Sequence, residues 1–124
     1  MIPIFSNSLG KEELNAIEKV FESKWVGSGD ETLKFERQFG DRLNSKYSLS
    51  FNCATAILYG SMKIFDIKPG DEVLIPTINF IGCTNAIIDA GAKPVFCDVD
   101  LNTFNILPEE IDKKRTDKTK ALLM

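Results

Sequence analysis

Residues 71–99 read DEVLIPTINFIGCTNAIIDAGAKPVFCDV, and the fold class follows from them. Two short apolar runs, at 72–75 and 94–99, have the length and composition of buried strands. Between them, residues 80–90 have the pattern of a helix, and Gly91 is well placed as its C-terminal cap. The order strand, helix, strand predicts a right-handed crossover and a parallel sheet.

The same alternation extends to both sides of this unit. Residues 47–51 alternate apolar and polar side chains, which predicts a further strand, and a helix follows through about residue 65. Residues 107–111 start a short helix, and residues 120–124 begin a strand. The predicted order is therefore β-α-β-α-β-α-β, an α/β fold with a mostly parallel sheet and flanking helices.

Two amphipathic helices precede the predicted sheet. The first covers 11–23, and the second carries Phe35, Phe39 and Leu43 at a spacing of four. We expect residues 1–45 to form a helical N-terminal arm and residues 46–124 to form the α/β part. Because the last predicted strand has no closing turn, we also expect a fold that is incomplete at its C-terminus, and hence a fragment.

The composition excludes several classes of protein. Among 124 residues, 44% are hydrophobic and 27% are charged, and the net charge is −3 with both signs interspersed. This balance argues against nucleic acid or an anionic membrane as the main partner. No apolar run approaches the ~20 residues of a membrane helix. The start of the chain has no signal-peptide pattern, so we expect a cytoplasmic protein.

The cysteines and the missing histidine limit the chemistry. Cys53, Cys83 and Cys97 match no zinc spacing and sit among apolar residues, so we interpret all three as reduced, packed thiols. The chain contains no histidine, the commonest general base and metal ligand. We predict no metal site, and any reaction must use another group or a cofactor.

Two loops that follow predicted strands are candidate binding sites. At 52–55, small and hydroxyl residues lead from a strand into a helix, where free N–H groups and the helix dipole favour phosphate. Ordinary helix capping by Asn52 or Thr55 is the alternative. At 76–80, Phe80 could present its ring to a flat cofactor at the carboxyl end of a strand, or it could be one more core aromatic.

Two other segments are weaker candidates. The stretch from Trp25 to Gly29 suits either a loop that folds over a ligand or a plain turn between helices. Asp98 and Asp100 flank Val99, and paired carboxylates can perform acid–base work. Aspartate is also common in turns at strand ends, which is the simpler interpretation.

A series of short motifs occurs in collinear order over nearly the whole chain. They are Trp25-Val26-x-x-Gly29, Phe35-Glu36-x-x-Phe39, Asn52-x-Ala54-Thr55-Ala56, Pro69-Gly70-Asp71-Glu72-Val73, Pro76-x-x-x-Phe80, Gly91-Ala92-x-Pro94-Val95-Phe96-x-Asp98-Val99-Asp100 and Thr119-Lys120-Ala121. Together they resemble the DegT/DnrJ/EryC1/StrS aminotransferases. The resemblance implies a fold-type-I architecture, pyridoxal 5′-phosphate (PLP) as cofactor, and a homodimer with active sites at its interface.

The resemblance also implies roles for particular residues. Ala54 and Thr55 lie where such enzymes hold the PLP phosphate, and Phe80 lies where an aromatic ring stacks on the pyridine. The Trp25–Gly29 stretch resembles a loop near the substrate. Most members have glycine at the position of Ala54 and serine at that of Cys53. No residue here matches the Schiff-base lysine, the aspartate beside the pyridine nitrogen or the second phosphate-binding serine, so we assign no catalytic residue.

The implied reaction is transfer of an amino group, usually from glutamate, to a keto-sugar carried on a nucleotide. We expect this of the full-length protein and expect the fragment itself to be inactive. A PLP-dependent sugar dehydratase of the same family is the nearest alternative. A non-catalytic regulator and a small α/β module that binds a phosphate ligand are alternatives from other classes.

Overall fold

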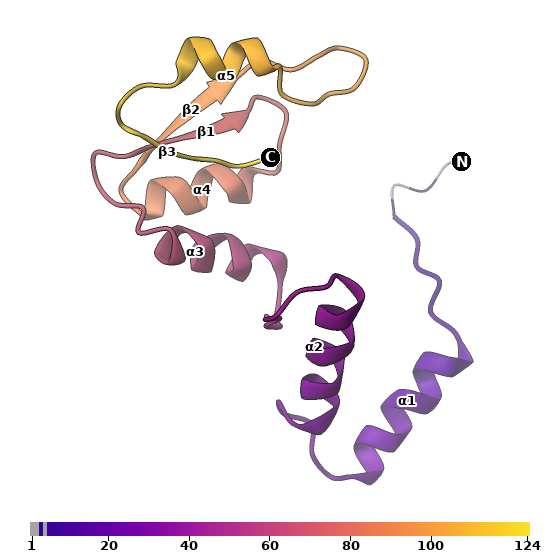
Figure 1. Ribbon diagram of the computed structural model, residues 1–124. Helices are drawn as coiled ribbons and strands as arrows, with labels where there is room; N and C mark the ends of the chain where they lie inside the picture. The colour runs from indigo at the N-terminus through magenta and orange to yellow at the C-terminus, as the bar shows by residue number, and fades with distance from the viewer. Residues whose placement is uncertain (1–2, 4) are drawn as a thin grey trace. The chain divides into compact units, whose positions relative to one another are not determined.

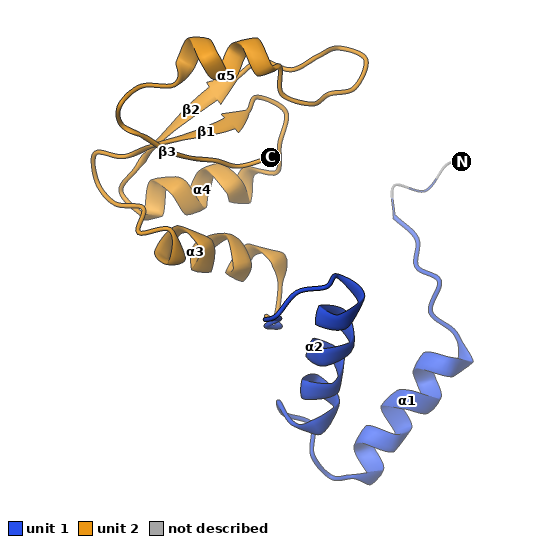
Figure 2. Ribbon diagram, viewed as in Figure 1, with its two compact units in different colours: residues 1–50 blue, residues 51–124 orange. Residues whose placement is uncertain are grey.

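The computed structural model describes residue 3 and residues 5–124, and it comprises two compact units. Unit 1 is Met1–Ser50 and unit 2 is Phe51–Met124 (Figure 2). Unit 1 is helical, and the sheet lies in unit 2. In the described residues, no helix has both the length and the apolar character needed to cross a lipid bilayer.

Unit 2 contains a parallel sheet of three strands. The strands are β1 (Glu72–Pro76), β2 (Lys93–Cys97) and β3 (Thr119–Leu122). Their order is β2-β1-β3, and β1 pairs in parallel with both neighbours. The central strand is buried at Glu72, Val73, Leu74 and Ile75. The predicted α/β class and the parallel pairing are confirmed.

Three helices accompany the strands. They are α3 (Ala54–Ile64), α4 (Ile81–Asp89) and α5 (Pro108–Lys114). Helix α4 packs on β1 and β2, α3 packs on α4, and α5 packs on β2. Figure 1 shows α5 on the opposite side of the sheet from α3 and α4, so both faces are covered as predicted. Gly91, with φ at 78°, ends α4 in the left-handed conformation that glycine favours.

The strand predicted at 47–51 does not form. Ser50 donates through its backbone N–H and its Oγ to Glu36 Oε1, at 2.8 and 2.7 Å. Ser45 Oγ donates to the carbonyl oxygen of Tyr47 at 2.7 Å. The alternation of side chains marks an extended segment, but a strand exists only when its backbone pairs with a neighbouring strand. Here the polar groups bind side chains of the same unit.

The second predicted strand is shorter than expected. It ends at Cys97 and not at Val99, which instead forms an isolated antiparallel bridge with Ile106. Asp100 N–H donates to the carbonyl oxygen of Asn105 at 2.9 Å, and this bond closes the turn between the two bridge residues. The last two residues of the predicted strand, Asp98 and Val99, therefore lie outside β2, and Val99 pairs through the single bridge.

The core of unit 2 lies between the sheet and α3 and α4. It contains Met62, Ile67, Val73, Ile75, Ala86, Ile87 and Ala92. The cysteine prediction holds only in part: Cys97 is buried and Cys83 is intermediate, but Cys53 is exposed. The apolar neighbours of Cys53 in the sequence do not enclose it, because the residues around the start of α3 are themselves exposed.

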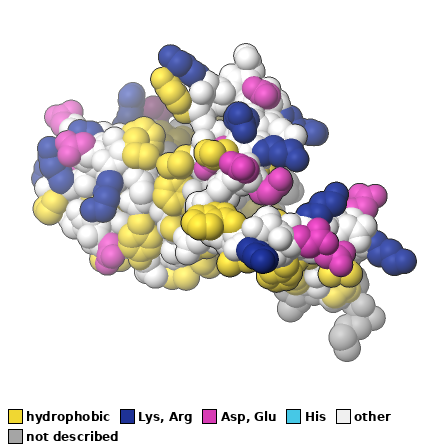
Figure 3. Space-filling view, turned by 90° about the horizontal axis from the view of Figure 1, so that it is seen from below, with side chains coloured by type: hydrophobic (Ala, Val, Ile, Leu, Met, Phe, Trp, Pro, Cys, Tyr) yellow, Lys and Arg dark blue, Asp and Glu magenta, His cyan; other side chains and the backbone are white. Residues whose placement is uncertain are grey.

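Unit 1 contains α1 (Lys11–Glu22) and α2 (Asp30–Arg42), close to the predicted positions. Helix α1 has no buried residue among those described. Its apolar side chains Leu14 and Phe21 are 63% and 66% exposed, and Phe39 of α2 is 47% exposed. Figure 3 shows hydrophobic side chains at the surface of the molecule. Apolar exposure of this kind is typical of surfaces that contact other protein.

A cluster of charges ties α5 to the sheet. Glu110 accepts from Lys113 Nζ at 2.9 Å and pairs with Lys114 Nζ at 3.2 Å. Lys114 Nζ also donates to the carbonyl oxygen of Phe96, in β2, at 2.7 Å. The hydrogen bonds from Lys113 and then Lys114 lower the pKa of Glu110 from 4.5 to about 2. The folded state therefore favours the charged form of this carboxyl.

We expect the substitution Glu110→Gln to destabilise the fold in a pH-dependent way. Because the folded pKa is depressed, the stabilisation is present above pH 4.5 and is lost as the pH falls towards about 2. The variant should therefore melt below the wild type at neutral pH, and the difference should shrink across that interval. Thermal melts over a pH series measure it. Glu109→Gln, at an exposed neighbouring position, is the control; an equal effect there would contradict the assignment.

Candidate functional site

The candidate site lies at the carboxyl edge of the sheet in unit 2. Figure 1 shows that α3 and α4 both begin at the end of the sheet where β1 finishes. In open parallel sheets, ligands bind in the crevice beyond the carboxyl ends of the strands. The two loops singled out from the sequence, at 52–55 and 76–80, therefore come to the same edge of the fold.

The first turn of α3 presents backbone donors without intrahelical partners. The N-cap is Cys53, with extended backbone, and its side chain makes no capping hydrogen bond. The first helical bond runs from Ile57 N–H to the carbonyl oxygen of Cys53 at 3.4 Å. The N–H groups of Ala54 and Thr55 precede this bond and make no hydrogen bond to any residue that the structure describes, so they can bind a ligand. The alternative that Asn52 or Thr55 caps the helix is wrong.

Charge distinguishes the helices that begin at this edge. Within the described residues, α3 and α4 have no acidic residue in their first turn. The other three helices each have two, namely Glu12 and Glu13, Asp30 and Glu31, and Glu109 and Glu110. Acidic side chains in the first turn interact favourably with the helix dipole, but they repel an anionic ligand. Their absence from α3 and α4 leaves positive potential available to an anionic ligand. The sequence contains this signal, but the prediction of a phosphate site at 52–55 did not use it.

Thr55 is the second residue of α3 and is partly exposed, and Ala54 is exposed. No hydrogen bond joins the Thr55 hydroxyl to any other residue that the structure describes. A free hydroxyl beside free N–H groups forms a cluster of donors. Such a cluster fits a phosphate group, which accepts several hydrogen bonds at once.

Phe80 is the N-cap of α4, and its side chain is 63% exposed. The alternative that Phe80 is a core aromatic is therefore wrong within the described fold. A ring held at the start of a helix, at the carboxyl edge of a parallel sheet, is available to stack on a flat ligand. The residues present thus fit a cofactor that combines a phosphate with an aromatic ring.

The loop before Phe80 is held by bonds that the sequence did not reveal. The N–H and the Oγ of Thr77 both donate to the carbonyl oxygen of Cys97, each at 2.9 Å. Asn79 Nδ2 donates to the carbonyl oxygen of Pro76. A Thr and an Asn after a strand are common loop residues, and only the neighbouring strand end shows which acceptor they meet.

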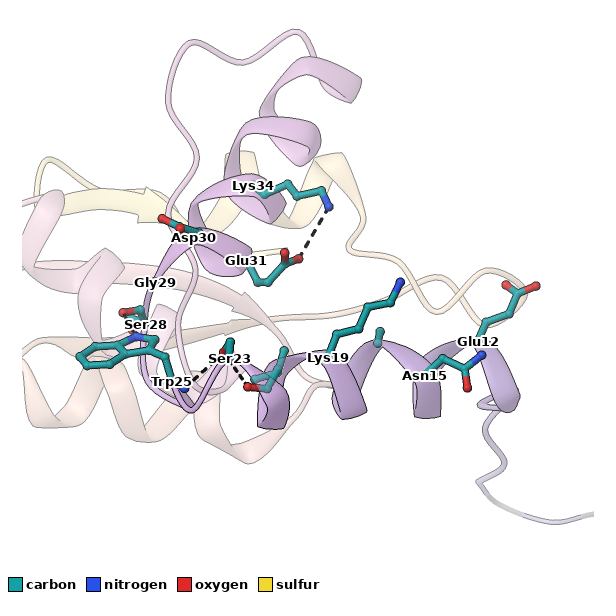
Figure 4. A pocket seen from close by; sticks show the side chains of 12 residues that line it. Glu12, Asn15, Lys19, Ser23, Trp25, Ser28, Gly29, Asp30, Glu31 and Lys34 are labelled. Carbon is teal, nitrogen blue, oxygen red and sulfur yellow. Dashed lines mark hydrogen bonds and ion pairs between the residues drawn. The ribbon is translucent and has the colours of Figure 1, made fainter.

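The Trp25–Gly29 stretch forms a turn between α1 and α2. Trp25 Nε1 donates to the carbonyl oxygen of Ser28 at 2.9 Å, and the indole lies against Gly29, where a Cβ would be 2.8 Å from the ring. The turn borders an open cavity of about 930 Å³ in unit 1, shown in Figure 4. A plain turn between the two helices therefore explains both Trp25 and Gly29.

The aspartates around Val99 serve the backbone. Asp98 Oδ1 accepts from Val99 N–H at 2.9 Å. Asp100 Oδ1 accepts from the N–H groups of Asn102 and Thr103, at 3.1 and 2.8 Å. The bond from the Thr103 N–H is the main cause that lowers the pKa of Asp100. Both carboxylates accept hydrogen bonds from backbone N–H groups close by in the chain, so the turn interpretation accounts for both residues.

Comparison with known proteins gives a consistent result. A family model described as the DegT/DnrJ/EryC1/StrS aminotransferase family matches residues 7–124. The chain is 40% identical over 126 aligned residues to dTDP-4-dehydro-2,3,6-trideoxy-D-glucose 4-aminotransferase of Saccharopolyspora spinosa. That alignment covers 100% of this chain and 33% of the relative. The chain spans about a third of the length of the curated relatives that it matches.

Solved structures share the fold. The aminotransferase TlmJ from Streptoalloteichus hindustanus superposes with a TM-score of 0.92 at 41% identity, over 98% of this chain and 34% of that one. GDP-4-keto-6-deoxymannose-3-dehydratase, solved with a trapped PLP-glutamate geminal diamine, superposes with a TM-score of 0.90 at 27% identity. That match covers 97% of this chain and 33% of the dehydratase.

Proposed function

The chain belongs to the DegT/DnrJ/EryC1/StrS aminotransferase family, and from that premise we propose that the protein carrying it is a sugar aminotransferase. It transfers an amino group, from glutamate, to a keto-sugar attached to a nucleotide. The observation that supports this most strongly is the 40% identity to a dTDP-sugar 4-aminotransferase along the whole chain. The exposed apolar faces of α1 and α2 are compatible with a homodimer.

Pyridoxal 5′-phosphate is the cofactor of the family. In our proposal, the N–H groups of Ala54 and Thr55 and the Thr55 hydroxyl hold its phosphate. The support is the uncapped start of α3, with no acidic residue in its first turn. Free donors and the helix dipole act together on a dianionic group, so they bind and orient the phosphate end.

Phe80 holds the ring end of the cofactor in this proposal. Its exposed ring follows β1 and begins α4, at the edge where α3 also begins. Contact with an aromatic face orients a flat ring and keeps water from that face. When bound, PLP supplies the electron sink for the chemistry, and the protein residues bind and orient it.

A sugar dehydratase is the second candidate function. The support is the dehydratase structure that superposes with a TM-score of 0.90. Both reactions use the same cofactor in this family, so the residues of the phosphate and ring sites serve either one. The two differ in the fate of the sugar: one gains an amino group in place of its carbonyl oxygen, and the other loses a hydroxyl.

We expect the purified full-length protein to bind PLP and, with glutamate, to form 2-oxoglutarate and an aminated sugar. The test is PLP titration followed by absorbance, and then incubation with glutamate and with dTDP- and GDP-linked 4-keto sugars. Mass spectrometry identifies the product. Loss of an oxygen atom without amination would favour the dehydratase, and failure to bind PLP would contradict both candidates.

A further inference from the structure

We propose that Asn79 is a positioning residue that holds the ring of Phe80 in place for the cofactor. This inference rests on the proposed function, because it concerns how the PLP site is shaped. Asn79 itself is assigned no contact with the reacting atoms. It acts through the loop that joins β1 to α4, and its effect is therefore expected on cofactor binding geometry.

The loop is fixed at both of its ends. At its start, Thr77 donates twice to the carbonyl oxygen of Cys97, the last residue of β2, with both distances 2.9 Å. At its end, Cys83 N–H donates to the carbonyl oxygen of Phe80 at 2.9 Å, where α4 begins. Ile78 and Asn79 lie between these anchors, and their N–H groups make no backbone bond within the described chain.

The Asn79 side chain braces this middle part. Its Nδ2 donates to the carbonyl oxygen of Pro76, three residues earlier, and so closes the loop across its width. Asn79 is also the residue that directly precedes Phe80. The backbone that leads to the exposed ring is therefore held by Thr77 at the start of the loop and by Asn79 directly before the ring.

The other end of the same amide reduces the net stability that the side chain contributes. Asn79 Oδ1 is buried and has no hydrogen-bond partner among the residues described. An unpaired buried acceptor lowers stability. Flipping the amide would bring two oxygens together at Pro76, so the orientation with Oδ1 unpaired is set by the brace. The loop therefore keeps a costly polar group in order to hold its shape beside Phe80.

Asn79→Leu is the informative variant, in the full-length protein. Leucine has nearly the same size. The substitution leaves the Pro76 carbonyl without its donor but also removes the unpaired oxygen, so the two effects on stability offset each other and the apo melting temperature should fall little. PLP binding should weaken roughly twofold to tenfold, the effect of one lost hydrogen bond. The visible circular dichroism of bound PLP, measured at saturation, should fall because the ring contact is displaced. Asn79→Asp, isosteric but without the donor, should show the same change in dichroism if Asn79→Leu does not fold.

Asn102→Leu is the matched control, because Asn102 is exposed in the turn after Asp100 and its side chain makes no hydrogen bond in the described structure. It should leave both PLP signals unchanged. Wild-type affinity and dichroism in Asn79→Leu and Asn79→Asp would overturn the positioning role alone. A lowered apo melting temperature with unchanged dichroism would also overturn it, in favour of a purely stabilising role. A wild-type protein that binds no PLP would overturn the proposed function and this inference together.

Discussion

Replacing Ile87 by alanine should lower the free energy of unfolding by about 2–5 kcal/mol, the usual cost of truncating a buried isoleucine. Ile87 is 0% exposed and packs in the core with Val73 and Ile75 of β1. The removed atoms leave a cavity between α4 and the central strand, which the short strands cannot fill without losing their pairing. Denaturant melts of the apo protein measure the loss.

Two further variants test whether the loss of stability depends on the size of the truncation and on the burial of the side chain. Ile87→Val removes a single methylene and should cost only about 0.5–1.5 kcal/mol. Ile88→Ala makes the same chemical change one residue later, where the side chain is 56% exposed, and should cost less than Ile87→Ala. An Ile87→Ala protein as stable as the wild type would contradict the packing of α4 on β1.

In the full-length protein, replacing Thr55 by valine should weaken PLP binding roughly tenfold to hundredfold, because a hydrogen bond to a charged group contributes about 1.5–3 kcal/mol. Valine has nearly the same shape as threonine and lacks only the hydroxyl. The free N–H groups of Ala54 and Thr55 remain in the variant, so binding should be weakened and not abolished. Titration of the apo protein with PLP gives the affinity.

Thr55→Ser is the control, because it keeps the hydroxyl and should keep most of the affinity. The structure also separates this prediction from a loss of stability. The N-cap of α3 is Cys53, so Thr55→Val removes no capping bond and the apo melt should change little. Unchanged PLP affinity together with a destabilised apo protein would contradict the phosphate assignment and restore a structural role for Thr55.

The proposed phosphate and ring sites show how far the sequence alone could lead. The small and hydroxyl residues at 52–55 and the aromatic residue after a strand were compatible with a phosphate site and a ring site, and the family resemblance assigned those roles to Ala54, Thr55 and Phe80. The sequence could not distinguish binding from capping at Thr55, or an exposed ring from a core aromatic at Phe80. Those distinctions depend on where the neighbouring elements lie, and no local pattern carries that information.

The sequence by itself determined the helices, the turns and the parallel class of the sheet. A helix forms its hydrogen bonds within its own segment, so the apolar spacing of α1 and α2 and the glycine after α4 predicted those elements closely. The order of α4 between β1 and β2 predicted parallel pairing because a crossover helix returns the chain to the end of the sheet where β1 began, so β2 runs in the same direction.

Only the tertiary structure decided whether the segment at 47–51 forms a strand and which conformation the loop at Asn79 adopts. A strand takes its hydrogen bonds from residues remote in the chain, and at 47–51 Ser50 bonds to Glu36 instead of to a neighbouring strand. Thr77 and Asn79 acquire their roles from the carbonyl oxygens of Cys97 and Pro76. A polar side chain has many possible partners, and the packing of the chain selects the one that it meets.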